Sequence, residues 1–443
     1  MCRRPFILFL CAMLVVTTFL PGLLTGCHNG KKKTKEGSEE TWQGVITVWD
    51  FPRWPDKNGN RFGWIEKKIK EFEEAHPGVF VHLRPLKWEY GLIELRAAAA
   101  AGTYPDIAPV ASGYDFIYEG YLEPVDEYFS PNELERYESR AIDAVTYRGR
   151  IYGFPWFMTT YGLFINKEIF KAKNVTIPKS GSWAYDEFVS ALQKVTHDSS
   201  KSEKIDHYGF NLYLSPGSYQ VWGFLTMDGA KIFDEQDNFV LNSQEGISAL
   251  TKLTDLEAKY KVVPTKEFGV LEETKVWGDF CEKQKIAVYP AGPWAIKILN
   301  DRYKTGKGFE FDLMPYPKGE GIPSAIALVS GYAIFKQKDE KKKALCAEFL
   351  KYITSENEQQ ALAEYGVFSV YTQVLEEIQD NPLIGKMKDI LDTAEILPKV
   401  KNWNKHDEAI TAQIRLALLS QKSPSQALKD AAKAVEAIQK GAP

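Results

Sequence analysis

The chain contains little cysteine, with five residues in 443, and three of these lie within the first 27 positions. Only Cys281 and Cys346 remain in the rest of the sequence, which excludes the dense disulfide framework that stabilises small secreted domains. Cys346 precedes Phe349 and Leu350 by about one helical turn, and a free cysteine in such a pattern behaves as a small buried hydrophobe. A bridge between Cys281 and Cys346 is the less favoured alternative.

Motifs of known enzyme classes are also absent. The chain has no G-x-S-x-G elbow, no H-E-x-x-H zinc motif, no C-x-x-C pair and no Walker-type phosphate loop. A stretch that begins at Asp56 is similar to a calcium loop, but Arg61 stands where glycine is needed and Lys67 where glutamate is needed. The six histidines share no metal-ligand spacing. We therefore expect no catalysis, no cofactor and no metal ion.

One enzyme class stays open as an alternative. A secreted carbohydrate-active hydrolase needs two carboxylates that face one glycosidic bond. Asp50, Glu89, Asp115 and Asp279 are candidates, and sequence alone does not place any two of them together.

A strong excess of one charge is missing as well. The formal net charge is −4, and the lysines and glutamates are intermixed along the chain. No basic stripe of the kind that binds a phosphate backbone is present, so nucleic acid is not an expected partner. About 400 residues after the amino-terminal segment exceed what one hydrophobic core usually organises, so we expect two lobes.

The amino terminus has the order of an export signal. Arg3 and Arg4 precede an apolar run over residues 6–19, and the sequence L-T-G-C ends at Cys27. This sequence resembles the bacterial lipobox, in which the signal is cut before the cysteine and the thiol receives a diacylglyceryl group. We expect a signal peptide over residues 1–26 and lipidation of Cys27. The apolar run is short for a membrane span, so a retained transmembrane helix is the weaker interpretation.

Residues 27–44 have the composition of a flexible tether. They include three consecutive lysines at 31–33 and almost no apolar side chain before Trp42. Such a segment cannot bury enough apolar surface to fold by itself. We therefore expect a solvated linker between the anchor and the folded protein.

The pattern after the linker predicts an α/β fold. Residues 44–49 are rich in β-branched side chains and read as a strand, and residues 64–75 place Ile65, Ile69 and Phe72 on one helical face. Residues 79–83 alternate as a second strand, residues 89–101 read as a second helix, and residues 106–110 begin a third strand. This β-α-β-α-β order predicts a mostly parallel sheet with helices on both faces.

Aromatic residues are abundant, with 11 Trp, 22 Tyr and 25 Phe. Many of them fall in segments with glycine or proline, where loops are expected. The C–H face of a pyranose stacks on an aromatic ring, and its hydroxyls need Asp, Glu, Asn or Arg side chains as partners. The aromatic content therefore favours a sugar ligand, although for any one ring a place in the core is about equally expected.

Several short motifs follow one another in a recognisable order. The first are G-T-Y-P-D-I at 102–107, G-Y-L-E-P-V-D at 120–126, Y-G-F-P at 152–155, F-I-N-K-E-I-F at 164–170 and S-W-A-Y-D-E-F at 182–188. They are followed by K-I-A-V at 285–288, G-P-W at 292–294, S-G-Y at 330–332 and A-L-K-D at 427–430. In this order, the chain resembles family 1 of the bacterial extracellular solute-binding proteins, the sugar-binding proteins related to maltodextrin-binding protein.

The resemblance implies a type II periplasmic-binding-protein fold, with a ligand cleft between two α/β lobes. It places three crossovers near residues 157–160, 314–316 and 364–368. The expected amino-terminal lobe comprises residues 45–157 and 315–365, and the carboxy-terminal lobe comprises residues 158–314 and 366–443. The implied function is capture of a sugar or oligosaccharide outside the cytoplasmic membrane by a lipid-anchored monomer, which delivers it to the transmembrane subunits of an ABC permease.

The resemblance also implies which residues contact the ligand, and we expect Asp115, Trp156, Trp294 and Trp403 to matter most. Asp106 and Asn166 are expected to have structural roles, because such side chains usually cap backbone N–H groups. The full expected set is Trp49, Asp50, Trp54, Ser112, Tyr114, Asp115, Trp156, Thr159, Asn211, Tyr213, Trp222, Gly292, Trp294 and Trp403.

One segment departs from the family pattern, and the identity of the ligand stays open. The segment after Gly366 lacks the proline that relatives often carry, which weakens the placement of the third crossover. A polyamine would suit acidic groups and aromatic rings, whereas a phosphodiester would need several cationic side chains in the cleft. A polyamine, a glycerophosphodiester or a peptide therefore stays as an alternative ligand for the same fold.

Overall fold

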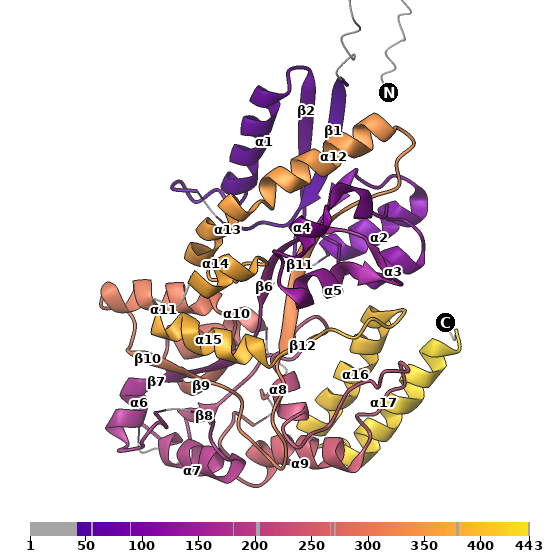
Figure 1. Cartoon of the computed structure of the whole chain (residues 1–443). Helices are drawn as coiled ribbons and strands as arrows, with labels where there is room; N and C mark the ends of the chain where they lie inside the picture. Colours follow the sequence, from indigo (N-terminus) through magenta and orange to yellow (C-terminus); the bar gives the residue numbers. More distant parts are fainter. Residues whose placement is uncertain are drawn as a thin grey trace, which may run out of the picture. The chain divides into compact units, whose positions relative to one another are not determined.

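A computed structural model describes residues 42–441, except 55, 89, 180, 201–203, 266, 270–271 and 378–380 (Figure 1). The predicted signal peptide, the predicted lipidation site Cys27 and residues 28–41 of the predicted linker lie outside the described residues.

The first sheet contains six strands in the order β12-β11-β3-β1-β2, and β6 pairs with β11 beside this path. β1 runs parallel to both β2 and β3, whereas β11 runs antiparallel to β3 and to β6. In β1 the side chains of Ile46 and Val48 are buried while Val45 is exposed, as expected when alternate residues face the core. The strands are β1 (Gly44–Asp50), β2 (Val79–Pro85), β3 (Ile107–Ala108), β6 (Phe154–Thr159), β11 (Ile326–Ile334) and β12 (Glu395–Ile396).

The predicted β-α-β-α-β opening is confirmed. Between its strands lie α1 (Gly63–Ala75) and α2 (Gly91–Ala101), so α2 begins two residues later than expected. α1 buries Ile65, Ile69 and Phe72, the face that its spacing predicts. α2 ends at Gly102, whose positive φ of 68° suits glycine and lets the following N–H groups bond back to the helix.

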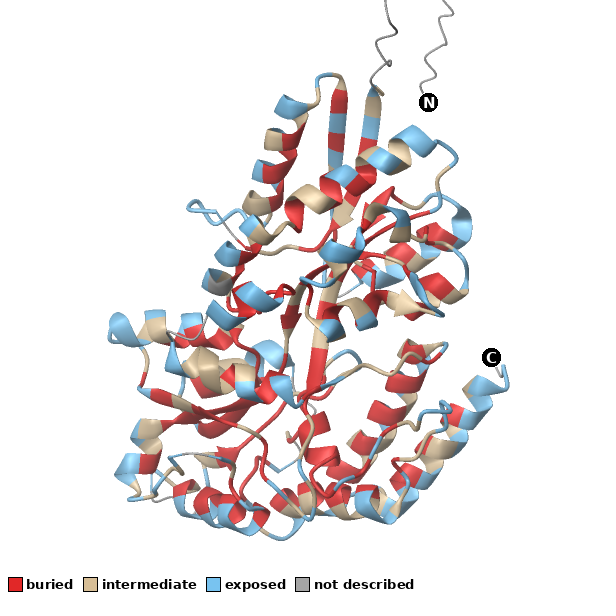
Figure 2. Ribbon diagram, in the orientation of Figure 1, coloured by how far each residue is buried: buried red, intermediate tan, exposed pale blue. Residues whose placement is uncertain are grey.

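The second sheet contains four strands in the order β10-β7-β9-β8. β7 and β9 are buried along their whole lengths, which fits their continuous apolar sequences. Figure 2 shows this buried centre, with exposed residues on the covering helices and on the loops. The strands are β7 (Gly162–Asn166), β8 (Tyr208–Phe210), β9 (Ile286–Ala291) and β10 (Phe311–Met314).

Helices cover both sheets. α1, α5 and α12 contact the first sheet, and α6, α7, α10 and α15 contact the second, while α16 and α17 pack on each other and on α9. A short ribbon of β4 (Thr146–Tyr147) and β5 (Arg150–Ile151) follows α5. The remaining elements are α3 (Tyr114–Tyr118), η1 (Asp126–Tyr128), α4 (Pro131–Leu134), α5 (Ser139–Val145), α6 (Lys167–Ala172), α7 (Tyr185–Val195), α8 (Trp222–Leu225), α9 (Gln244–Ala258), α10 (Glu273–Cys281), α11 (Trp294–Lys304), α12 (Glu340–Ile353), α13 (Glu356–Leu362), η2 (Ala363–Tyr365), α14 (Thr372–Glu377), α15 (Pro382–Asp392), α16 (Trp403–Leu418) and α17 (Pro424–Gln439).

Three segments lie side by side where the chain passes between the sheets. β6 leads through Thr160 into β7, and its residue Met158 exchanges two backbone hydrogen bonds of 2.8 Å with Phe368. The other neighbour of β6 is β11, which pairs Leu328 with Thr159. The crossovers and lobe boundaries expected from the sequence stay a prediction.

The second predicted crossover, at residues 314–316, follows β10 and leads into residues 316–324. The hydroxyl of Tyr316 donates a hydrogen bond to the carbonyl of Gln220 at 2.8 Å, and Thr226 donates to the carbonyl of Ser324 at 2.9 Å. These bonds hold residues 316–324 against α8 and against Gln220 and Thr226, which flank this helix beside the second sheet. Further along the chain, Leu328 of β11 pairs with Thr159 of β6.

Both remaining cysteines are buried as free thiols, so the disulfide alternative is wrong. Burial raises the pKa of the Cys281 thiol to about 11.

Asp106 and Asn166 have the predicted structural roles, because Asp106 accepts hydrogen bonds from Thr47 and Asn166 caps α6. Within the described part of the chain, every helix is too short or too polar to cross a membrane.

Candidate ligand-binding site

A cavity of about 170 Å³ lies between α2, the loop from β3 to α3, and the start of α16. It brings together Ser112, Tyr114, Asp115 and Trp403, which are four of the expected ligand-binding residues. The carboxyl ends of parallel strands are the usual location of ligand sites in open α/β sheets, and the β3–α3 loop leaves such an end. The full lining is Leu92, Arg96, Pro109, Val110, Ser112, Gly113, Tyr114, Asp115, Phe116, Tyr219, Leu397, Trp403 and Asn404.

Asp115 is the most connected polar side chain of this cavity. Its carboxylate accepts hydrogen bonds from the backbone N–H of Asn402 at 2.7 Å and from Nδ2 of Asn404 at 3.0 Å. Nη2 of Arg96 lies 3.1 Å from the same carboxylate and forms an ion pair with it. Asp115 therefore joins α2 and α3 to the start of α16, and this bonding fixes the carboxylate in place.

Trp403 is the first residue of α16, and only 7% of it is exposed. Its indole N–H donates a hydrogen bond to the hydroxyl of Tyr219 at 3.1 Å. The ring packs edge-on against Trp222, with 5.6 Å between the centroids, and roughly parallel to Tyr219 at 6.5 Å. Trp403 is thus both a wall of the cavity and a part of the core, and Trp222 lies behind it.

Ser112 and Tyr114 contribute less polar surface than expected. The Ser112 hydroxyl donates to the carbonyl of Val329 at 2.9 Å. The Tyr114 hydroxyl points into the core and donates to the carbonyl of Ala144 at 2.8 Å, and burial raises the pKa of this phenol. Tyr114 therefore lines the cavity while its hydroxyl is bonded elsewhere.

A second group of expected residues forms a buried aromatic cluster after β1. Trp54 and Trp156 pack at 4.5 Å between ring centroids, and Trp64 contacts both. Asp50 is buried nearby, where it accepts a hydrogen bond from Tyr332 at 2.8 Å. Burial raises the pKa of Asp50, and the charge of Arg53 opposes this shift. Since Trp156 is fully enclosed, the structure gives it no surface for stacking on a ligand.

Beside this cluster lie residues that the expected set omits. The guanidinium of Arg53 lies between aromatic rings, 5.1 Å from the Trp88 centroid and 5.2 Å from the Trp156 centroid. Trp88 stacks on Phe51 at 4.5 Å and an interplanar angle of 13°, and 53% of Trp88 is exposed. Arg53 and Trp88 follow the carboxyl ends of β1 and β2, and this position after a strand is the signal that points to them.

Thr159, Gly292 and Trp294 lie together at the end of β9. A Cβ placed on Gly292 would lie 3.4 Å from Oγ1 of Thr159 and 2.8 Å from the Trp294 ring. Trp294 also packs edge-on against Trp277 at 4.9 Å. These three residues are adjacent, but none of them lines the 170 Å³ cavity.

The last three expected residues are dispersed. Asn211 is buried and accepts a hydrogen bond from the N–H of Leu212, and Tyr213 follows it. Trp49 is covered by Arg84, whose guanidinium lies 3.9 Å from the ring centroid. None of Trp49, Asn211 and Tyr213 lines the cavity that contains Asp115 and Trp403.

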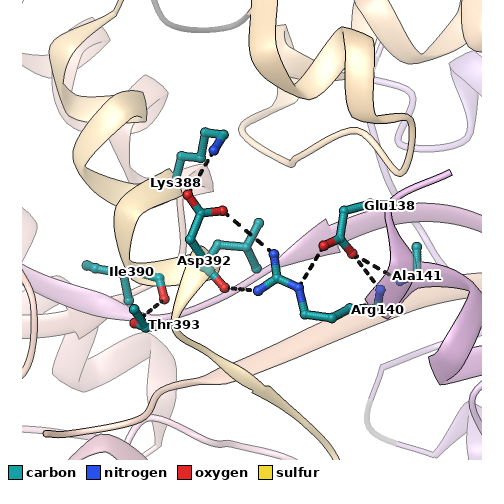
Figure 3. A network of polar contacts seen from close by, with 8 residues as sticks. Glu138, Arg140, Ala141, Lys388, Ile390, Asp392 and Thr393 are labelled. Carbon is teal, nitrogen blue, oxygen red and sulfur yellow. Dashed lines mark hydrogen bonds and ion pairs between the residues drawn. The ribbon is translucent and has the colours of Figure 1, made fainter. Parts of the chain in front are cut away.

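A polar contact joins α5 and α15, outside the lining of this cavity (Figure 3). Glu138 caps α5 through the N–H groups of Arg140 and Ala141, and it accepts a hydrogen bond from Nε of Arg140 at 2.8 Å. The Arg140 guanidinium reaches the carbonyl of Leu391 and lies 3.6 Å from the Asp392 carboxylate. A cation at the carboxyl end of a helix is favourable, so this contact ties α15 to the helices of the first sheet.

A larger cavity of about 460 Å³ lies between β10, residues 315–323 and α15, and it contains none of the expected residues. Apolar residues such as Met314, Pro315 and Ile390 form much of its lining, with lysines among the others. The smaller cavity is the better candidate for a polar solute because carboxylate, guanidinium, amide and indole groups converge there. Among the described residues, no three His, Cys, Asp or Glu side chains are placed to hold a metal ion.

The comparisons with protein families and curated proteins agree with one another. The model of one family, described as bacterial extracellular solute-binding protein, matches residues 67–386. A putative binding protein of Brucella abortus is 20% identical over 85% of this chain and 90% of its own length. The maltotriose-binding protein of Pyrococcus abyssi is 24% identical over 69% of this chain and 64% of its own length.

Solved structures share the fold. An ABC substrate-binding protein of Listeria monocytogenes in complex with cycloalternan has a TM-score of 0.74 and 19% identity, covering 90% of this chain and 99% of its own. The maltose/maltodextrin-binding domain of Bdellovibrio bacteriovorus bound to maltotriose has a TM-score of 0.73 and 20% identity, covering 90% and 100%. The predicted two-lobe, periplasmic-binding-protein-like fold is confirmed.

Proposed function

This chain belongs to the bacterial extracellular solute-binding proteins, and from that membership we propose that it captures a sugar or short oligosaccharide and delivers it to the permease of an ABC transporter. The observation that carries the choice of ligand is the cavity formed by Asp115, Trp403, Arg96, Ser112 and Asn404. An indole ring offers an apolar face to the C–H groups of a pyranose, and the polar groups offer donors and acceptors to its hydroxyls.

The printed ligands of the relatives support this choice. The Pyrococcus abyssi protein is named for maltotriose, and the Listeria and Bdellovibrio structures contain cycloalternan and maltotriose. These names concern those proteins. For the present chain, they make glucose-containing oligosaccharides the first compounds to test.

The size of the cavity bears on how binding proceeds. A volume of about 170 Å³ is below the roughly 300–1,000 Å³ of most small-molecule sites. The cavity is formed by segments from both ends of the chain, and the passages beside β6 join the two sheets. We infer that the lobes separate about these passages to admit a ligand longer than one sugar ring, and close when it is bound.

The remaining parts of the proposal concern location and partners. Lipidation of Cys27 would hold a monomeric binding protein at the outer face of the cytoplasmic membrane, with residues 28–44 as its tether. Closure of the lobes would then present both of them to the transmembrane subunits of the permease. Binding is the whole of this mechanism, and no bond is broken.

Two observations weigh against the alternatives. Asp50 and Asp115 already accept hydrogen bonds from neighbouring groups, which leaves them less available to a polyamine or as the acid and nucleophile of a hydrolase. A phosphodiester would need several unpaired cationic groups, whereas Arg96 of the cavity is paired with Asp115.

A thermal-shift screen tests the proposal, since a ligand that binds only the folded state raises the melting temperature. The panel contains maltose, maltotriose, cycloalternan, spermidine, glycerophosphocholine and a tripeptide. We expect a shift with at least one saccharide and none with the other compounds. A shift with spermidine alone, or release of products from an oligosaccharide, would replace the sugar-binding proposal with the corresponding alternative.

A further inference from the structure

The carboxyl ends of three neighbouring parallel strands lie along one edge of the first sheet. β1 pairs with β3 on one side and with β2 on the other, and all three run in the same direction. The loop after β3 forms part of the cavity that contains Asp115. Arg53 follows β1 and Trp88 follows β2, so the strand order continues from this cavity to Arg53 and then to Trp88. The chain then enters α2, whose residue Leu92 lines the cavity.

One face of the Trp88 indole is open. Phe51 stacks on the other face, with 4.5 Å between the ring centroids. The guanidinium carbon of Arg53 is 5.1 Å from the Trp88 centroid and 5.9 Å from the Phe51 centroid. A group on the face of Trp88 opposite Phe51 would be much farther from Phe51 than this, so Arg53 lies at the edge of the indole. Among the described residues, no other ring or cation stacks on Trp88, which is 53% exposed.

The guanidinium of Arg53 has one edge without an acceptor. Its Nη1 donates to the hydroxyl of Ser330 at 3.3 Å. Nε is buried and has no hydrogen-bond partner, and within the described part of the chain Nη2 forms no hydrogen bond either. Nε and Nη2 are neighbours in a planar group, and together they supply two parallel N–H donors to the two oxygens of a carboxylate. A buried donor without an acceptor is unfavourable, so a carboxylate at this edge would remove a cost.

The charge of Arg53 is not neutralised by a direct ion pair among the described residues. The acidic group on which this charge acts is Asp50, whose carboxylate accepts hydrogen bonds from the hydroxyl of Tyr332 and from the next backbone N–H, each at 2.8 Å. Burial raises the pKa of Asp50, although the charge of Arg53 opposes the shift. The neighbouring cation Arg84 is paired with Glu94 at 3.0 Å. Arg53 is therefore the better placed of these two cations to bind an external anion.

We propose that the ligand is an acidic oligosaccharide, in which one uronic acid ring stacks on the open face of Trp88 and its carboxylate binds Nε and Nη2 of Arg53. This proposal rests on the proposed sugar-binding function and specifies the class of sugar. The indole suits the C–H face of the ring, and charge-assisted bidentate bonds to a guanidinium are stronger than the bonds of a neutral hydroxyl. The cavity of Asp115 and Trp403, of about 170 Å³, holds a neighbouring ring of the same ligand.

The packing around Arg53 gives a carboxylate a route to the guanidinium. Phe157 of β6 lies against the guanidinium, 5.4 Å from the ring centroid, and it pairs with Ser330 of β11. This pairing belongs to the segments that join the two sheets. The lobe separation that we infer for ligand entry would therefore loosen the packing over Arg53, and closure would restore it around the bound carboxylate.

The test is isothermal calorimetry of the full chain with matched pairs of trisaccharides. The two members of a pair differ only in the exocyclic group of each ring, which is a hydroxymethyl group in one and a carboxylate in the other. The pairs are galactotriose with galacturonotriose, cellotriose with glucuronotriose, and mannotriose with mannuronotriose. At pH 7, where the uronates are ionised, we expect at least one acid to bind about tenfold more tightly than its neutral partner.

Five variants separate the contributions. Arg53→Gln is expected to lose the preference for the acid, through about a tenfold loss of affinity for the acid and little change for the neutral partner. Arg53→Lys keeps the charge without the two parallel donors, and an intermediate preference is expected. Trp88→Ala is expected to weaken both members of a pair. Arg84→Gln, which removes a cation already paired with Glu94, and Tyr303→Ala, which removes an exposed ring on α11, are the matched controls and retain the parent's affinities.

Far-ultraviolet circular dichroism and the melting temperature without ligand check that each variant is folded. If Arg53→Gln does not fold, Arg53→Lys and Trp88→Ala provide the comparison. Neutral trisaccharides that bind as tightly as the acids would overturn this proposal and leave the sugar-binding function standing. An equal preference for the acid in the parent and in the Arg53 variants would overturn it as well. Binding of no saccharide at all would overturn the proposed function and this proposal with it.

Discussion

The carboxylate of Asp115 accepts the backbone N–H of Asn402 at 2.7 Å, across 287 positions of the sequence. Asn402 has a positive φ of 61° and directly precedes Trp403, the first residue of α16. Asp115 thus fixes the backbone from which the Trp403 ring projects. This makes Asp115 a positioning residue for the indole, in addition to any contact that its carboxylate makes with a ligand.

Asp115→Ala is expected to weaken ligand binding and to destabilise the fold. The substitution leaves Arg96 and the N–H of Asn402 without their partner, and a buried group that loses its hydrogen bond costs about 1–3 kcal/mol. Urea denaturation measures the stability, and calorimetry with the saccharide found in the screen measures the affinity. Asp301→Ala is the control, since this carboxylate pairs with exposed Lys297, and a change within about 0.5 kcal/mol is expected there. Equal affinity in Asp115→Ala and the parent would remove Asp115 from the site.

Trp403→Ala is expected to abolish binding at a large cost in stability, about 3–5 kcal/mol, because the ring packs against Tyr219, Trp222 and Phe233. Trp403→Phe separates the two effects, since it retains an aromatic face and loses the N–H that bonds to Tyr219. We expect this variant to fold with reduced affinity, and Tyr219→Phe tests the lost hydrogen bond alone.

Gly366→Ala is expected to destabilise the protein by about 2 kcal/mol or more. Gly366 has a positive φ of 70°, and a Cβ there would lie 2.6 Å from Cα of Trp294 and 2.8 Å from the carbonyl of Pro293. Both the backbone conformation and the close approach therefore require glycine. Gly385→Ala, inside α15 with open space around it, is the matched control and is expected to stabilise by up to about 1 kcal/mol. Equal melting temperatures for the two variants would contradict this account of the third passage.

The contribution of Asp407 to the free energy of unfolding is expected to fall as the pH rises, which is unusual for a carboxylate. Burial raises its pKa to about 6 from the ordinary 3.8, although Gly217 and Thr411 donate hydrogen bonds to it. Between these two values the folded state binds more protons than the unfolded state, so this group's contribution to stability falls as the pH rises. Asp407→Asn removes the ionisation. Relative to the parent, it is expected to gain up to about 3 kcal/mol on going from pH 4 to pH 7.5.

Urea denaturation of Asp407→Asn and the parent at several pH values measures this difference. Asp234→Asn is a control on an exposed loop, where hydrogen bonds from Asn238 lower the carboxylate pKa instead of raising it. A gap between Asp407→Asn and the parent that stays constant from pH 4 to pH 7.5 would show that Asp407 ionises at its ordinary pKa.

Arg140→Ala is expected to speed ligand release. The variant loses the contacts of the guanidinium with the Leu391 carbonyl and Asp392 (Figure 3), which join α5 to α15. One charge-assisted hydrogen bond contributes about 1.5 kcal/mol, which corresponds to roughly a tenfold change in affinity. Stopped-flow measurements are expected to show faster dissociation with an unchanged association rate. Lys304→Ala, at an exposed position, is expected to retain the parent's dissociation rate, and the same rate in Arg140→Ala would count against a role for this contact.

Local patterns in the sequence were sufficient for the α/β class and for the first elements of the fold. The alternation of Ile46 and Val48 and the helical spacing of Ile65, Ile69 and Phe72 each report which side of an element faces a core. The ordered motifs likewise indicated the family that the comparisons identify. These signals are contained within a few turns or strands, so they can be read without knowing what packs against them.

The tertiary structure was needed to tell which aromatic residues are buried and which are exposed. Trp156 and Trp88 both occupy segments that read as loops, yet Trp156 is fully enclosed and Trp88 is half exposed, because long-range packing by Trp54, Trp64 and Tyr332 closes over only the first. For the same reason, the tyrosine at 114 proved to direct its hydroxyl into the core.

The sequence by itself determined the fold class, the family and the presence of an aromatic, polar set of candidate residues. Only the tertiary structure decided that Asp115 meets Asn402 and that Met158 meets Phe368. Both contacts join segments that are far apart in the sequence, and the sequence order does not reveal that they are close in space. Such pairings depend on the packing of whole elements, and packing is a property of the complete fold rather than of any local pattern.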